Sequence, residues 1–344
     1  MADRPRDVGA SVRARLLDRA RAEPTDFQGL LMRYALERLL YRLSVSPYRE
    51  RFILKGALLF ATWVDAPFRP TRDLDLLGYG DPDPDAIAAL FRALCTMPVP
   101  DDGVTFDATR LQATPIREAQ EYGGIRVRTT TMMAGARIPI QVDVGFGDAI
   151  TPGPVEIDYP TLLDAPSPHL RAYPVETVIA EKFEAITTLG MANSRLKDFY
   201  DLWLIAQTFT FDRTVLETAV RRTFTRRGTA LPAQVPPGLG EAFAAEKAGQ
   251  WRAFLGRERL AAAPDSFAVI VAGLRAFLMP LLDGTPAAEF MWLPGGPWRN
   301  APQIQHKERE LKRAALRRAL KEGENSGKAD DSLQGLLDEL DRDH

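Results

Sequence analysis

The hydrophobic positions of this 344-residue chain change their spacing partway along, and the change predicts two kinds of structure. Up to about residue 165, short apolar runs with a period of two are typical of strands. Two amphipathic helices, over residues 26–43 and 86–95, lie among these runs. From Pro174 onward, apolar residues recur every three or four positions, which predicts helices. The pattern indicates an α+β fold, with a mixed-sheet lobe followed by a mostly helical C-terminal lobe.

Charge and proline content divide the chain into four segments. Residues 1–25 are charged throughout and are predicted to form an N-terminal arm. Residues 26–170 contain the expected strands, and residues 171–298 form the helical lobe, which ends near Pro297. Residues 299–344 have mixed charge and few apolar positions, so we expect a charged, partly disordered tail.

Two acids occupy alternate positions of one predicted strand, in the segment Asp73-Leu-Asp75-Leu-Leu. Successive side chains of a strand point to opposite faces, so both carboxylates leave the same face. They repel each other unless a cation joins them. A solvated strand face can carry such a pair, but the preceding Arg69, Thr71 and Arg72 favour a binding site.

A third acid lies on another predicted strand. In residues 137–148 the apolar side chains alternate, which places Gln141 and Asp143 together on the polar face. Glycines at 145 and 147 indicate the end of this strand, and Asp148 is more typical of a loop or cap. Carboxylates from neighbouring strands can hold Mg²⁺ together with substrate phosphate oxygens, so Asp73, Asp75 and Asp143 are candidate metal ligands.

An apolar strand followed by a glycine precedes the acid pair. Residues 52–55 are predicted to form this strand, and Gly56 opens a helix-like pattern. The first turn of such a helix can present free N–H groups to a phosphate. A strand, a glycine turn and an acid pair together suggest a site for a metal and a nucleotide.

Two predicted helices carry further charged candidates. In residues 175–190, Lys182 falls within the apolar stripe, so its ammonium must either reach solvent or meet an anion such as a triphosphate. In residues 193–205, Asp198 and Asp201 repel each other at a spacing of three, and Lys197 is expected to pair with Asp201. Asp198 is then available to a cation or a substrate. Structural ion pairing remains the alternative for Lys197 and Arg195.

Composition excludes several classes of site. With 44 basic and 46 acidic residues the net charge is −2, which does not indicate a nucleic-acid partner. Local arginine clusters could contact phosphate or could be solvated faces; they comprise Arg117, Arg126, Arg128, Arg221, Arg222, Arg226 and Arg227. One cysteine and three scattered histidines exclude a zinc-type cluster and an internal disulfide, which fits the cytoplasm. The apolar run 267–282 is interrupted by Arg275 and is too short to span a membrane.

Taken in order, these motifs resemble the AbiEii/AbiGii toxin family, which includes the MenT-type toxins. The resemblance covers about residues 26–210. It rests on Lys55-Gly56, Arg69-x-Thr71-x-Asp73-x-Asp75, Asp143 in Val-Asp-Val-Gly-Phe, Glu181-Lys182, and Arg195-x-Lys197-Asp198-x-x-Asp201. Members are nucleotidyltransferase-like proteins of type IV toxin–antitoxin and phage-defence systems. The resemblance implies a polymerase-β-like nucleotidyltransferase lobe.

Residue roles follow from this resemblance one position at a time. Asp73 and Asp75 match the acids that bind Mg²⁺ or Mn²⁺, and Asp143 matches the third acid. Lys182 matches a nucleotide-contacting lysine, and Asp198 matches a late catalytic acid. The residues expected at the NTP are Lys55, Gly56, Ala57, Arg69, Thr71, Arg72, Lys182, Arg195 and Asp201. Ala57 departs from the family, which commonly has Gly or Ser there, so phosphate binding would depend on backbone N–H groups and on Lys55 or Arg72.

The resemblance implies a metal-dependent toxin that transfers a nucleotide from an NTP to an RNA, with tRNA as the expected acceptor. It also implies a cognate antitoxin protein as partner, for which the tail could be a docking helix. Two other readings stay open: transfer to a small-molecule or protein hydroxyl, and a non-catalytic nucleotide-binding module. The intact acid triad argues against the module, and the arginine clusters favour RNA over a small acceptor.

Overall fold

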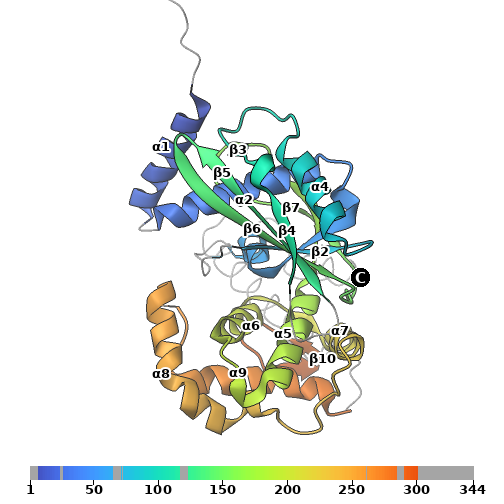
Figure 1. The fold of residues 1–344 in the computed structure, drawn as a ribbon. Helices are drawn as coiled ribbons and strands as arrows, with labels where there is room; N and C mark the ends of the chain where they lie inside the picture. The colour runs from blue at the N-terminus through green and yellow to red at the C-terminus, as the bar shows by residue number, and fades with distance from the viewer. Residues whose placement is uncertain are drawn as a thin grey trace, which may run out of the picture.

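The computed structural model describes residues 7–23, 26–64, 71, 73–116, 123–260, 262–284 and 290–300. Within these ranges the chain forms an eight-stranded sheet with helices, followed by a helical lobe that carries a three-stranded sheet (Figure 1). The α+β fold expected from the sequence is therefore confirmed.

The large sheet has the order β3-β5-β6-β2-β1-β8-β7, and β4 pairs with β5 beside that path. Strand β2 is parallel to β6, and β1 is parallel to β8. The pairs β1–β2 and β5–β6 are antiparallel, so the sheet is mixed. Its strands are β1 (Phe52–Lys55), β2 (Asp73–Gly78), β3 (Thr105–Phe106), β4 (Gln112–Ile116), β5 (Gly124–Met133), β6 (Ala136–Phe146), β7 (Val155–Asp158) and β8 (His169–Ala172).

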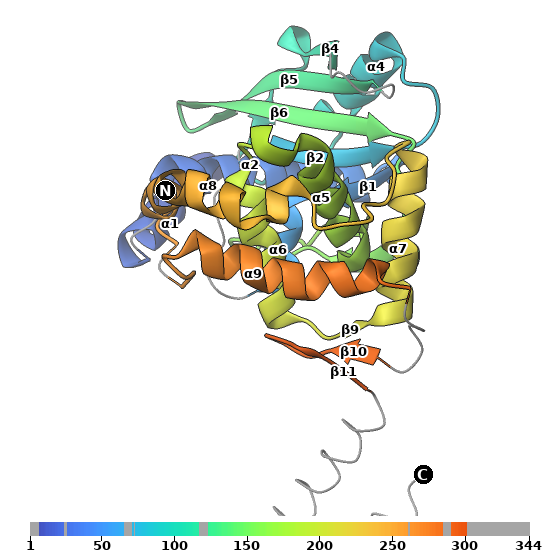
Figure 2. The same cartoon turned by 90° about the horizontal axis from the view of Figure 1, so that it is seen from below.

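Helices dominate the second half of the chain. The first half contains α1 (Val8–Ala22), α2 (Phe27–Ser44), α3 (Phe60–Trp63) and α4 (Pro84–Cys95). The helical lobe contains α5 (Val175–Leu189), α6 (Leu196–Thr208), α7 (Arg213–Arg226), α8 (Glu241–Glu258) and α9 (Phe267–Leu278). The small antiparallel sheet of β9 (Phe211–Asp212), β10 (Phe290–Trp292) and β11 (Trp298–Asn300) lies on the side of α9 away from β5 and β6 (Figure 2).

Local sequence explains where several helices begin. The carboxylate of Asp26 accepts hydrogen bonds from the N–H groups of Gln28 and Gly29 and so caps α2. Asp83 caps α4 in the same way, and Pro84 occupies the first helical position, where its missing N–H costs nothing. Helices α2 and α4 therefore each start after a residue whose side chain satisfies two of the free N–H groups.

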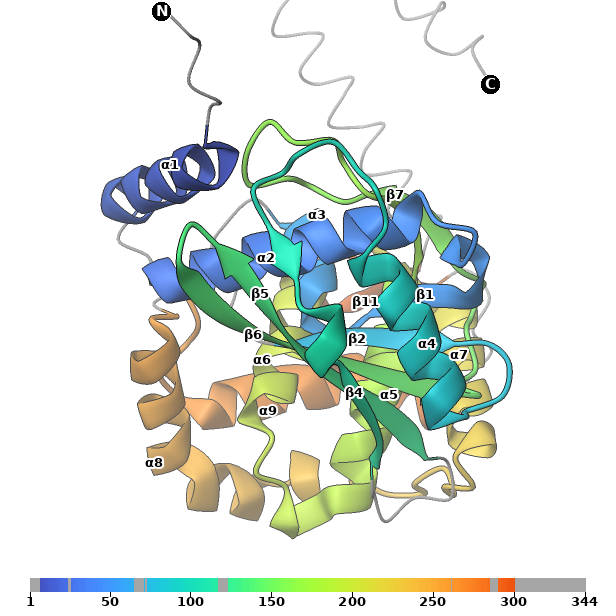
Figure 3. The same cartoon turned by 45° about the horizontal axis from the view of Figure 1, so that its top comes forward.

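The large sheet has one covered face and one open face. Helices α2 and α4 lie against the covered face, where Ile125, Val127 and Val142 are buried (Figure 3). The helical lobe lies on the other side of the sheet (Figure 1). Because strand side chains alternate, the residues between these apolar positions point to the open face. Among them are Arg126 and Asp143.

The N-terminal segment that we expected as a charged arm contains helix α1. Its Val12, Leu16 and Ala20 are buried, and the helix packs on α2. The charged positions on its remaining faces account for the composition seen in the sequence. Residues 1–6 and 24–25 of the expected arm, like residues 301–344 of the expected tail, lie outside the described residues.

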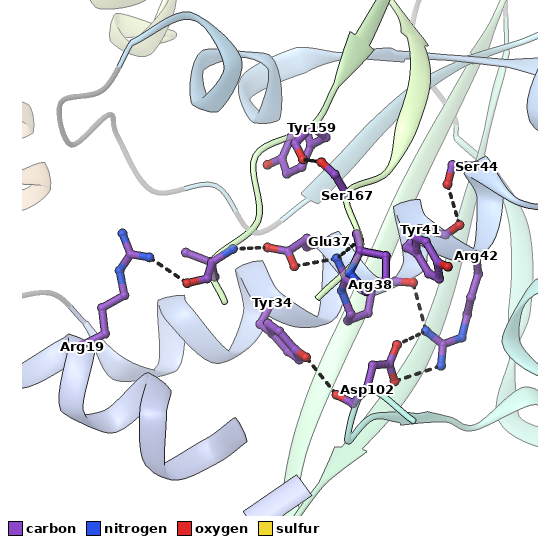
Figure 4. Close-up of polar contacts among 12 residues, drawn as sticks. Arg19, Tyr34, Glu37, Arg38, Tyr41, Arg42, Ser44, Asp102, Tyr159 and Ser167 are labelled. Atoms are coloured by element: carbon purple, nitrogen blue, oxygen red, sulfur yellow. Dashed lines mark hydrogen bonds and ion pairs between the residues drawn. The ribbon is translucent and has the colours of Figure 1, made fainter. Parts of the chain in front are cut away.

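Buried charged side chains of α2 connect this helix to the loops that contain Asp102 and Leu162 (Figure 4). Arg42 binds both carboxylate oxygens of Asp102, at 2.6 and 3.2 Å. Glu37 pairs with Arg38 at 2.8 Å and also accepts the N–H of Leu162 at 2.7 Å. Each buried charge thus has a partner, as a low-dielectric interior requires.

One predicted helix boundary was wrong. The helix expected over residues 193–205 begins at Leu196 and ends at Thr208. The side chain of Asn193 accepts the N–H of Arg195 at 2.8 Å, and this local hydrogen bond competes with helix formation at those positions. Within the described ranges, each helix falls short of the length and apolar character needed to cross a membrane.

Candidate active site

Four charged side chains form one row across the open face of the sheet. The strand register places Lys55 of β1 opposite Asp75 of β2, Asp75 beside Asp143 of β6, and Asp143 opposite Arg126 of β5. Neighbouring strands are about 4.8 Å apart, so adjacent members of the row lie within reach of each other. Asp73 lies one pleat along β2 on the same face. The sequence prediction that these acids share one face is confirmed.

Among the described residues, neither acid of β2 forms an ion pair, although Lys55 lies opposite Asp75 in the strand register. Burial raises the pKa of Asp73, and the charge of Asp143 adds to the increase. Burial also raises the pKa of Asp75 to about 6; Lys55 opposes this effect, whereas Asp143 and Asp73 reinforce it. A cation placed between these carboxylates would relieve the repulsion.

Gly56 makes room for Asp75. Its φ is +76°, a conformation that favours glycine, and it follows β1 directly. A Cβ at this position would lie 2.0 Å from Oδ2 of Asp75 and 2.7 Å from its Cγ. The glycine turn is therefore necessary for the present position of the Asp75 carboxylate. The next residue, Ala57, is buried.

Lys55 is held by a partly buried ionic cluster between the lobes. Its Nζ lies 2.7 Å from Oδ2 of Asp148, which also accepts the hydroxyl of Tyr173 at 3.2 Å. Burial acts to lower the pKa of Lys55, but the carboxylates of Glu181 and Asp148 produce a net increase. Lys55 therefore stays charged beside Asp75. Asp148 does lie in a loop, as expected, but it positions Lys55.

Arg227 closes this cluster from the C-terminal end of α7. Its guanidinium lies 2.8 Å from Glu184, 3.3 Å from Glu181 and 3.6 Å from Asp148. The neighbouring Arg226 donates to the carbonyl of Gly147. These two arginines, which the sequence offered as a basic patch, connect α7 to α5 and to the loop after β6.

Asp143 is engaged by Arg126. Nε of Arg126 lies 2.7 Å from Oδ1 of Asp143, and Nη2 lies 2.6 Å from Oδ2, which is a bidentate pair. The two side chains are 31% and 19% exposed. Arg126 was one of several clustered arginines in the sequence, and its partner could be found only from the register of β5 on β6.

Lys182 forms ion pairs with two aspartates of helix α6. Its Nζ lies 2.6 Å from Asp198 and 2.8 Å from Asp201, both of which are 1% exposed. The expected pair between Lys197 and Asp201 was wrong, because α5 packs against α6 and Lys182 takes that place. Arg195, at the N-terminus of α6, lies 2.7 Å from the other oxygen of Asp198 and is half exposed.

Lys197 instead lies near enough to the acid pair for its charge to act on both carboxylates. It is exposed on the first turn of α6, and its positive charge acts to lower the pKa of both Asp73 and Asp75. This proximity could not be predicted from the sequence, because it depends on how the helical lobe meets the sheet. Thr71 lies just before β2 and donates to the carbonyl of Asp73 at 3.3 Å. Arg69 and Arg72 lie outside the described residues.

The acid pair suits a metal that takes few protein ligands. In the part of the chain that the structure describes, no group of three or more His, Cys, Asp or Glu side chains is placed to hold a metal ion. Mg²⁺, however, commonly uses one or two carboxylates and completes its shell with water and substrate phosphates. Asp73 and Asp75, which form no ion pair with another described residue and whose pKa values are raised, fit that pattern.

A mixed sheet with an acid pair after a glycine turn, facing a helical lobe with a largely buried lysine, is compatible with a nucleotidyltransferase. The chain belongs to the family described as nucleotidyl transferase AbiEii toxin of type IV toxin–antitoxin systems, whose model matches residues 38–273. The family resemblance and the enzyme class inferred from the motifs are thereby confirmed. A toxin of such a system implies an antitoxin partner.

Two crystal structures from Helicobacter pylori are similar to this chain at low sequence identity. One, of a candidate nucleotidyltransferase, has 12% identity and a TM-score of 0.44, and the match covers 75% of this chain and 99% of that one. The other, JHP933, has 13% identity and a TM-score of 0.42, and the match covers 74% and 94%. No curated protein matches the chain.

Proposed function

We propose that this nucleotidyltransferase is metal-dependent and transfers a nucleotide from an NTP to an RNA acceptor, with tRNA as the first acceptor to test. The observation that carries the proposal is the row of Lys55, Asp75, Asp143 and Arg126 with Asp73 beside it. This row combines an acid pair whose pKa values are raised with a cation at each end, as transfer of a charged phosphoryl group requires.

Asp73 and Asp75 would hold Mg²⁺ or Mn²⁺. The bound metal would polarise the α-phosphoryl group and neutralise the pyrophosphate leaving group. Their half-buried position and raised pKa favour a ligand that brings positive charge. Gly56 leaves room for the Asp75 carboxylate. The charge of Lys55 reduces the repulsion between Asp73 and Asp75, while its ammonium group is hydrogen-bonded to Asp148.

The helical lobe would supply the cations that face the triphosphate. Lys197 is exposed on the side of the acids, and Arg195 is half exposed next to it. Lys182 is only 15% exposed between Asp198 and Asp201, so it would contact the nucleotide while its charge is shared with them. Asp198 would then orient Lys182 and Arg195 together, a positioning role in place of direct proton transfer.

The open sheet face favours a long acceptor over a small one. Beyond Asp73 the polar face continues to Arg128 of β5, which bonds Gln141 at 3.2 Å, and to Gln112 of β4. Arg128 and Gln112 are exposed. A single-stranded RNA end could lie along such a face with its phosphates near Arg128. RNA and NTP substrates would place the reaction in the cytoplasm.

Incubation of the purified chain with total RNA and each α-³²P-labelled NTP in turn, with Mg²⁺, tests this function directly. We expect label on RNA in the size range of tRNA, and none from the Asp75→Asn variant or in EDTA. Label on protein or on small molecules alone would instead support transfer to another hydroxyl. NTP binding without any transfer would support a nucleotide-binding module and would refute the proposed activity.

A further inference from the structure

Asp143 occupies the position of a third metal ligand, yet both of its oxygens are engaged. The Nε and Nη2 groups of Arg126 approach Oδ1 and Oδ2 at 2.7 and 2.6 Å. This fork orients a planar guanidinium and a carboxylate rigidly relative to each other. The two residues face each other across the antiparallel ladder of β5 and β6, so the backbone also holds them together.

Charge argues against a metal at this carboxylate. A divalent cation bound to Asp143 would lie next to the guanidinium of Arg126, and like charges so close repel strongly when partly buried. Among the described residues, no arginine forms such a fork with Asp73 or Asp75 on the neighbouring strand. The lack of a three-acid metal group among the described side chains agrees with a metal held on β2 alone.

Arg126 is suitably placed to act on a substrate anion. Its guanidinium is 31% exposed on the open face and lies two strands from Asp75 in the same row. Its charge reaches the acid pair, since it acts to lower the pKa of Asp73. A phosphate group bound near Asp73 and Asp75 would therefore lie between a cation on β5 and the cations of the helical lobe.

We propose that Asp143 is a positioning residue for Arg126 and not a metal ligand, and that Arg126 is a catalytic residue that contacts a phosphate group of the NTP or of the acceptor. The proposal deepens the function given above and rests on it. Asp143 would hold the guanidinium in one orientation, so that no side-chain freedom is lost when the phosphate arrives.

A direct measurement of metal binding distinguishes whether Asp143 is a metal ligand or a positioning residue for Arg126. It can be made without an acceptor RNA. Mn²⁺ binding to the full chain is measured by electron paramagnetic resonance for the parent, Asp75→Asn and Asp143→Asn proteins. We expect Asp75→Asn to weaken Mn²⁺ binding at least about ten-fold and Asp143→Asn to change it less than about two-fold. Equal weakening by both variants would overturn the proposal. Unchanged binding in Asp75→Asn would instead count against the metal site of the proposed function.

Transfer kinetics then test the link between the two residues. Arg126→Met and Asp143→Asn should each lower kcat/KM at least about ten-fold. The kcat/KM of the double variant should be no more than about two-fold below that of the less active single variant, because both substitutions remove the same positioned guanidinium. A raised KM for the NTP assigns the contact to the triphosphate, and a raised KM for the RNA assigns it to the acceptor. Losses that multiply, or full activity of Arg126→Met, would overturn the proposal.

Two further variants control for structure and charge. Arg126→Lys keeps the charge but cannot form the fork, so it should fold and remain at least about three-fold below the parent; parental activity in a folded Arg126→Lys protein would contradict the role of the fork. Arg21→Met removes an exposed arginine that pairs with Asp18 on α1, on the covered side of the sheet. It should change neither Mn²⁺ binding nor kcat/KM.

Discussion

Replacing Gly56 by alanine should disable the active site while leaving the fold largely intact. The added Cβ would lie 2.0 Å from Oδ2 of Asp75, and side chains do not sustain contacts under 3.0 Å, so the carboxylate must move by about 1 Å. A displacement of about 1 Å in a catalytic group can cost about 100-fold in rate. Alanine at a φ of +76° also costs about 1–2 kcal/mol in backbone strain.

Gly135 offers a matched control in the turn between β5 and β6. Its φ is +79°, and a Cβ there would meet nothing within 4 Å. Gly135→Ala should therefore lose a similar free energy of unfolding, measured by chemical denaturation, and keep its activity. We expect kcat/KM to fall about 100-fold in Gly56→Ala and less than about two-fold in Gly135→Ala. Near-parental activity in Gly56→Ala, or equal losses in the two variants, would refute the reasoning.

Three other predictions follow from the charges at the site. In EDTA the folded chain keeps the proton of Asp75 up to about pH 6, whereas the unfolded chain releases it near its ordinary pKa of 3.8. Ionised Asp75 therefore disfavours the fold, and Asp75→Asn should raise the free energy of unfolding above pH 6 by about 2–3 kcal/mol, a gain that disappears below about pH 4. Denaturant titrations across this pH range would show it; a constant difference would contradict it. Lys182→Met should lower the free energy of unfolding by about 3–5 kcal/mol, because two buried carboxylates lose their cation. Adding Asp198→Asn should restore part of that loss, and an unchanged or lower stability of the double variant would argue against the ion pair. Expression of the chain without an antitoxin should slow growth, and Asp75→Asn at a matched soluble level should relieve it; equal growth of the two strains would remove the support for a catalytic toxin.

Interactions between close neighbours in the chain were predictable from the sequence. Alternation along β2 placed Asp73 and Asp75 on one face, and alternation along β6 placed Asp143 away from the core. The caps of α2 and α4, Asp26 and Asp83, are likewise local, because a capping side chain reaches N–H groups only two or three residues away. The order of these motifs was sufficient to identify the family, which its match over residues 38–273 confirms.

Pairing between distant elements could not be predicted in this way. Lys55 bonds Asp148, 93 residues away in the chain. Asp201 pairs with Lys182 of another helix, although Lys197 is closer to it in the sequence. A charged group forms an ion pair only with a group of opposite charge about 3 Å away, because the Coulomb energy decreases with separation and with access of solvent. Those distances depend on strand register and helix packing, which periodicity does not specify.

The sequence by itself determined the two-part α+β fold, the strand faces and the residue types at the site. The tertiary structure alone decided their contacts: that Gly56 leaves space for Asp75, that Arg126 pairs with Asp143, and that the charge of Lys197 acts on the acid pair. Periodicity is a property of the local backbone, whereas each of these roles arises where two or more elements meet. The sequence therefore shows which chemical groups are available, and the packing of helices and strands decides how those groups are arranged.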